Sequence, residues 1–141
     1  MIASNGQLLH STYQYPTSPT SIFMVAQNYG GALFGGVSSG NRFFAVSESG
    51  SSTSAQGGFN SVSYFSNSSA IGSTRGNIHT ATISFSLLTT LATSTASDEY
   101  TTLGYIFKGL NSSRYKEFII FPNQTVSRTG VDSNIVNFYN F

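Results

Sequence analysis

The chain contains no cysteine, and this absence excludes two kinds of site. A disulfide framework needs paired thiols, and a thiolate metal centre needs cysteine ligands. Stability must therefore come from packing. A chain of 141 residues is long enough to bury a hydrophobic core without cross-links, and we expect a single domain spanning residues 1–141.

Charged residues are also scarce. They make up 8% of the chain, against about 25% in ordinary domains. The six Lys and Arg residues are scattered and form no basic stripe, so we expect no nucleic-acid partner. A surface with few charges costs little to desolvate, which favours assembly into oligomers.

Long apolar runs are missing as well. No stretch approaches the roughly twenty apolar residues that cross a bilayer. The first six residues lack the basic and apolar regions of a signal peptide. We expect no membrane partner and synthesis in the cytoplasm as a soluble protein.

What the chain does contain is Ser, Thr, Gly and Asn, with 12 Phe and 8 Tyr to supply bulk. This composition favours a β-protein with hydroxyl-covered faces. Asn28 to Gly31 predicts the turn of a hairpin, and the Ser- and Gly-rich stretch from Glu48 to Gly58 predicts a flexible loop. The apolar patterns predict strands at residues 7–10, 22–27, 32–36, 42–47, 59–65, 78–88, 101–107 and 115–121.

The stretch from Tyr115 to Phe121 organises this prediction. Its apolar side chains fall on both faces of an extended segment, as in a central buried strand. Pro122 ends the strand, and Ser127 is placed to cap a short helix with an apolar face formed by Val131, Ile135 and Phe138. The expected fold is all-β: an antiparallel β-sandwich of jelly-roll type with a short C-terminal helix. The residues expected to be most buried are Phe23, Val25, Ile83, Phe85, Phe118 and Ile120.

The same region resembles a known family. Leu103-Gly104-Tyr105, Lys108-Gly109, the strand ending in Glu117-Phe118-Ile119-Ile120-Phe121 and the segment Ser127–Tyr139 resemble the C-terminal half of concanavalin A-like, laminin-G-like lectin and glucanase jelly rolls. The similarity is to the short versions found in bacteriophage structural proteins. Residues 22–26 and 33–36 resemble the early strands of the family.

The resemblance implies a non-enzymatic structural protein of a phage virion, a capsid decoration or a fibre or tail component. Such a protein is made in the host cytoplasm, resides in the virion and contacts other virion proteins. The alternative is a carbohydrate-binding module that recognises host or environmental glycans. A small glycosidase is the third hypothesis.

Catalytic chemistry has little support in the residue pattern. The only carboxylates are Glu48, Asp98, Glu99, Glu117 and Asp132. They lack the E-x-D-x-x-E spacing by which concanavalin-like glucanases set an acid and a base on one strand. A Ser-His-acid triad using His10 or His79 is left open by residue type, but no G-x-S-x-G motif supports it. We expect no enzyme activity.

Metal and cofactor sites are not expected either. Calcium prefers six to eight oxygen ligands, several of them carboxylates. Asp98, Glu99 and Asp132 are the only candidates, and Asp132 falls within the predicted helix. Calcium is common near the glycan site of related lectins, and this chain departs from them in having so few acids.

Exposed aromatic residues provide the candidate binding residues. Tyrosine rings in polar loops can stack on sugars, and the candidates are Tyr29, Tyr64, Tyr100 and Tyr105. The C-terminal segment ends on Phe138, Tyr139 and Phe141, more apolar surface than a free helix should expose. These three residues predict an assembly interface, and with it a homo-oligomer, a trimer or part of a larger shell.

Overall fold

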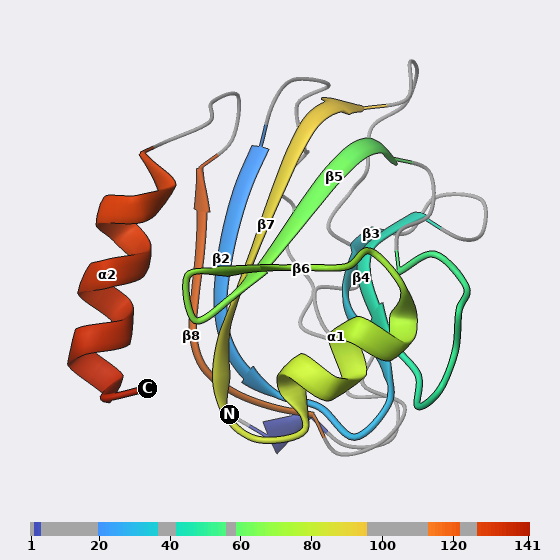
Figure 1. The fold of residues 1–141 in the computed structure, drawn as a ribbon, viewed down its shortest axis with the longest axis horizontal. Helices are drawn as coiled ribbons and strands as arrows, with labels where there is room; N and C mark the ends of the chain where they lie inside the picture. Colours follow the sequence, from blue (N-terminus) through green and yellow to red (C-terminus); the bar gives the residue numbers. More distant parts are fainter. Residues whose placement is uncertain (1, 4–19, 37–41, 56–58, 96–112, 122–126) are drawn as a thin grey trace.

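The computed structural model describes residues 2–3, 20–36, 42–55, 59–95, 113–121 and 127–141 (Figure 1). The strands are β1 (Ile2–Ala3), β2 (Thr20–Gln27), β3 (Gly31–Gly36), β4 (Arg42–Ser47), β5 (Phe59–Ser66), β6 (Ser69–Ile71), β7 (Ser86–Thr95) and β8 (Ser113–Phe121). The helices within these residues are α1 (Arg75–Thr82) and α2 (Arg128–Tyr139). The strands expected at residues 7–10 and 101–107 lie outside the described residues.

The main sheet is antiparallel and has six strands in the order β1-β8-β2-β7-β5-β6. Strand β2 lies at its centre, between β7 and β8. Strand β8, which we expected to be central, is flanked by β2 and by the two residues of β1. The mostly antiparallel β architecture with a short C-terminal helix is therefore confirmed, whereas the jelly-roll sandwich stays a prediction.

Both faces of the main sheet are covered, as Figure 1 shows. Helix α2 packs on one face, and the β3–β4 ribbon packs with α1 on the other. Side chains of β2 alternate between them: Ile22 and Met24 face the ribbon and α1, while Phe23 and Val25 face α2. All four are fully buried. This explains why β2 is apolar on both faces.

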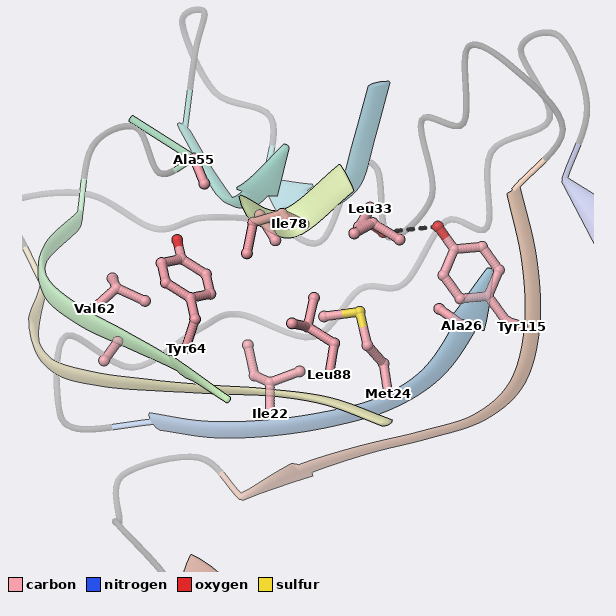
Figure 2. Close-up of a cluster of buried hydrophobic side chains, with 12 residues drawn as sticks. Ile22, Met24, Ala26, Leu33, Ala55, Val62, Tyr64, Ile78, Leu88 and Tyr115 are labelled. Atoms are coloured by element: carbon pink, nitrogen blue, oxygen red, sulfur yellow. Dashed lines mark hydrogen bonds between the residues drawn. The ribbon is translucent and has the colours of Figure 1, made fainter. Parts of the chain in front are cut away.

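The larger of the two cores lies between the main sheet and the layer of β3, β4 and α1 (Figure 2). Tyr64 and Leu88 of the main sheet point toward Ile78 of α1 and Leu33 of β3. Tyr115 of β8 closes one end of this core, where its hydroxyl donates a 2.9 Å hydrogen bond to the carbonyl oxygen of Leu33. The ribbon is thus joined to the main sheet by a buried polar contact as well as by apolar packing.

The turn after β2 leads the chain out of the main sheet. Gly30 and Gly31 have φ values of 147° and 94°, which glycine adopts readily. The buried Asn28 side chain holds this turn: Oδ1 accepts from the Gly30 amide at 3.0 Å, and Nδ2 donates to the Gly31 carbonyl oxygen at 3.2 Å. The expected hairpin is wrong, because β3 pairs with β4 and not with β2.

The strand expected at residues 78–88 is also wrong. Residues 75–82 form α1, whose N-cap Thr74 accepts a hydrogen bond from the Asn77 amide through its hydroxyl at 3.2 Å. Ile78 and Thr82, four residues apart, are the buried positions of this helix. Strand β7 begins only at Ser86. The alternation of Thr with apolar residues is compatible with the two-residue period of a strand and with the 3.6-residue period of a helix. The N-cap at Thr74 and the packing of Ile78 and Thr82 stabilise the helix.

Residues 48–55 are tied down, although their composition predicted flexibility. The Arg75 amide donates to the Thr53 carbonyl oxygen at 2.8 Å, and the Ala55 amide donates to the Ser73 carbonyl oxygen at 2.8 Å. The Val46 amide donates in turn to the Ala55 carbonyl oxygen at 2.8 Å. These bonds connect the start of α1 to β4 through the segment. Residues 56–58 of the expected loop lie outside the described residues.

Of the six residues expected to be most buried, Phe23 and Val25 are fully buried, as predicted. Phe85, Phe118 and Ile120 are half-buried and pack against the two cores. Ile83 is 52% exposed, because it follows the last turn of α1 instead of lying in a strand.

Helix α2 begins where the sequence predicted it, with Ser127 at the N-cap. The Ser127 side chain makes no capping hydrogen bond, so that part of the prediction is wrong. Val131 and Ile135 pack on the sheet as expected, but Phe138 is 79% exposed. The apolar stripe of α2 instead runs through Val136 and Tyr139.

Candidate functional site

The first candidate site lies at the end of β2 and is called the Tyr29 surface. It consists of Gln27, Tyr29, Ile83 and Arg114. Tyr29 and Ile83 are 50% and 52% exposed. The Gln27 side chain holds them together, since its Nε2 donates to the Tyr29 hydroxyl oxygen at 2.9 Å and to the Ile83 carbonyl oxygen at 3.1 Å. The turn after β2 and the end of α1 thus meet in one fixed surface.

Arg114 joins this surface through the sheet register. It is the antiparallel partner of Gln27 in the pairing of β2 with β8, and directly opposed residues share a face. The Arg114 side chain is exposed. The Tyr29 surface therefore combines an oriented aromatic ring, a fixed amide and a guanidinium.

Of the four predicted glycan-binding residues, Tyr29 has the expected exposure. Tyr64 does not: it is 2% exposed and lies in the core of Figure 2, so its ring presents no face to a ligand. Burial also raises the pKa of the Tyr64 hydroxyl. We assign Tyr64 a packing role. Tyr100 and Tyr105 lie outside the described residues.

The second candidate site is the aromatic end of α2, which consists of Phe138, Tyr139 and Phe141. The Phe138 and Tyr139 rings meet edge to face at a centroid distance of 5.0 Å. The Tyr139 and Phe141 rings stack at 5.6 Å. Tyr139 and Phe141 are half-buried against the sheet, whereas Phe138 is 79% exposed. The three predicted assembly residues are therefore in contact, and one of them faces solvent.

Strand β8 supplies charged partners for this aromatic end. Lys116 Nζ lies 4.5 Å from the centre of the Phe85 ring and 5.5 Å from that of Tyr139, within cation–π range. The pKa of Tyr139 is raised by burial and by the Glu117 carboxylate, to which its hydroxyl is hydrogen-bonded. These contacts fix the position of Tyr139, and Phe138 is held beside it.

The described carboxylates each contact a different partner. Glu48 pairs with Arg75 at 3.1 Å on the surface. Asp132 is fully buried and pairs with Arg128, and Glu117 faces Tyr139. Within the described ranges no three His, Cys, Asp or Glu residues are grouped to hold a metal ion. Asp98 and Glu99, the other two candidates, are outside those ranges.

His79 lies on α1 rather than on a strand. Its Nδ1 is 3.2 Å from the hydroxyl oxygen of Ser47 at the end of β4. Ser47 is buried, so its hydroxyl is not placed to attack a substrate. We interpret this pair as a contact that holds α1 on β4. His10, the other histidine, lies outside the described part of the chain.

Sequence reasoning missed Gln27 and Arg114 in the Tyr29 surface and Lys116 beside Tyr139. No local motif marks these residues, because the pairing register of β2 and β8 and the position of α1 bring them into place. The register depends on contacts between residues about ninety positions apart in the chain, which no local pattern records.

Neither described helix is long and apolar enough to cross a membrane. Three comparisons with known proteins gave no significant match: no family model, no curated protein and no solved structure matches this chain. Its function therefore has to be inferred from its own residues.

Proposed function

We propose that this protein is a non-enzymatic structural component of a phage virion, a capsid decoration or a fibre or tail component, built on a concanavalin A-like jelly roll. Its place of action is the virion, after synthesis in the host cytoplasm. Two observations in the sequence support the proposal: the resemblance of residues 103–141 to phage structural proteins and the 8% content of charged residues.

The structural observation that carries the proposal is the exposure of Phe138. This ring is 79% exposed, although Tyr139 and Phe141 beside it pack against the sheet. A large aromatic side chain held in place by its neighbours and left in water is typical of an interface core. We propose that Phe138 is covered by a second copy of this chain in a trimer or a larger shell, where other virion proteins adjoin it.

The test is the mass of the purified protein in light scattering at tens of micromolar. The wild-type chain should have a mass that is a multiple of 15.1 kDa, and Phe138→Ser should reduce it to 15.1 kDa. Asn137→Ser, at the neighbouring exposed position on α2, should behave as the wild type. A wild-type mass of 15.1 kDa that stays unchanged when candidate virion partners are added would contradict the proposal.

A second candidate function is carbohydrate binding without catalysis. The Tyr29 surface favours it, because a half-exposed ring that is fixed by a hydrogen bond loses little conformational entropy when it stacks on a sugar. The two functions are compatible, since the Tyr29 surface and Phe138 use different residues. Loss of glycan binding in Tyr29→Ala, with the oligomer intact, would separate them.

A further inference from the structure

The Tyr29 surface holds two groups that the fold does not use. Gln27 donates hydrogen bonds from its Nε2 to the Tyr29 hydroxyl and to the Ile83 carbonyl oxygen, and its Oε1 accepts no hydrogen bond from any described residue. The Arg114 guanidinium has no ion pair or hydrogen bond within the same part of the chain, and it is exposed. One acceptor therefore lies beside the Tyr29 hydroxyl, and one exposed cation lies opposite Gln27 in the pairing of β2 with β8.

These groups define the chemistry of that ligand. A half-exposed ring suits a flat apolar face such as the C–H face of a sugar. The fixed amide oxygen accepts from a hydroxyl. The guanidinium presents parallel N–H donors, which match the two oxygens of a carboxylate.

We propose that the Tyr29 surface binds a saccharide that carries a carboxylate. The Tyr29 ring stacks on the sugar face, Gln27 Oε1 accepts from a sugar hydroxyl, and Arg114 pairs with the carboxylate. This inference rests on the carbohydrate-binding function proposed above and specifies its ligand class.

The surrounding charges support an acidic ligand. Lys116, two residues after Arg114 on β8, is exposed with its ammonium over the Phe85 and Tyr139 rings, and it adds positive charge to this part of the sheet. The acid nearest in the strand, Glu117, is bonded to the Tyr139 hydroxyl and lies against α2. A nucleic acid fits less well, because it needs a row of cations along its phosphates.

The first experiment is a glycan array that carries uronic-acid and sialic-acid glycans beside their neutral counterparts. The wild-type protein should bind carboxylate-bearing glycans. Binding confined to neutral glycans would overturn the acidic specificity and leave carbohydrate binding intact. An array with no bound glycan would overturn both proposals.

The second experiment compares the best acidic glycan with its methyl ester, which keeps the sugar face and loses the charge. The free acid should bind about tenfold more tightly, the gain expected from one charge-assisted hydrogen-bond pair. Arg114→Gln should remove this difference without weakening binding of the ester, and Tyr29→Ala should weaken binding of both ligands.

Lys116→Gln is the matched control and should keep most of the preference for the free acid over the ester. Equal affinity of the wild type for acid and ester would refute the role of Arg114. Circular dichroism of each variant should show an unchanged fold.

Discussion

The hydroxyl of Thr89 on β7 donates a 2.7 Å hydrogen bond to Oδ1 of Asp132 on α2, and both residues are fully buried. Arg128, one turn before Asp132, neutralises the same carboxylate and lies 3.9 Å over the Phe65 ring of β5. Helix α2 is thus positioned on the sheet by a buried polar contact as well as by its apolar stripe.

Removing either partner of this contact should weaken the fold. Thr89→Val deprives the buried carboxylate of a donor and should lower the free energy of unfolding by about 2 kcal/mol. Asp132→Ala leaves the Thr89 hydroxyl without this acceptor and Arg128 without its ion-pair partner, although Arg128 still donates to the Ser68 carbonyl oxygen, and it should lower the free energy of unfolding by about 3 kcal/mol. Urea denaturation measures both. Ser63→Ala, at an exposed position on β5, should change the value by less than about 0.5 kcal/mol. Losses no larger than this control would mean that apolar contacts alone hold α2.

The two helical glycines should respond to alanine in opposite directions. A Cβ at Gly130 in α2 would lie 3.8 Å from the Ser127 hydroxyl oxygen, an ordinary contact. Gly130→Ala should therefore gain about 1 kcal/mol from helix propensity. A Cβ at Gly76 in α1 would lie 2.8 Å from the Ser51 backbone carbonyl oxygen. Gly76→Ala should lose about 1 to 3 kcal/mol through overpacking.

Thermal unfolding of the two glycine variants measures these changes. A rise in melting temperature for Gly130→Ala and a fall for Gly76→Ala are expected. If Gly76→Ala also raised it, α1 would not be packed against residues 48–55.

Tyr64 should make stability depend on alkaline pH. Burial raises the pKa of its hydroxyl in the folded state above the ordinary tyrosine value of about 10. Above that pH the unfolded chain releases the Tyr64 proton while the folded chain keeps it, so the free energy of unfolding falls as pH rises. The slope reaches at most about 1.4 kcal/mol per pH unit for one tyrosine.

The free energy of unfolding should be measured by denaturation between about pH 9 and about pH 11 for the wild type and for Tyr64→Phe. The variant has no ionisable hydroxyl at this position. The variant should show a shallower loss of stability. A residual slope is expected from Tyr139, whose pKa is also raised. Identical slopes in the two proteins would show that Tyr64 ionises as easily folded as unfolded.

Local patterns predicted the elements whose apolar residues are compatible with only one type of secondary structure. Strands β2, β4, β5 and β8 and the start of α2 follow from runs of β-branched and aromatic residues and from Pro122 and Ser127. The segment around Ile83 is compatible with either a strand or a helix, and tertiary packing determines that its first part is helical. Tyr64 and Tyr29 have similar polar neighbours in sequence, yet one is buried and the other exposed, because burial depends on which layer covers each position.

The candidate sites were predictable only as residue types. That the C-terminal aromatic residues form one cluster follows from their closeness in the chain. The combination of Gln27 with Ile83 and Arg114 could not be predicted from the sequence. These residues are brought together by the pairing of β2 with β8 and by the position of α1, which the sequence pattern predicted as a strand.

The central place of β2 has a consequence for biosynthesis. Its two neighbours, β7 and β8, are translated long after it, and β8 is complete only at Phe121. Until then the nascent chain carries an apolar strand with at least one open edge, which favours pairing with other chains. We expect the protein to fold only after β8 has left the ribosome. In the meantime, a chaperone that binds extended apolar segments should find its principal target at residues 20–27.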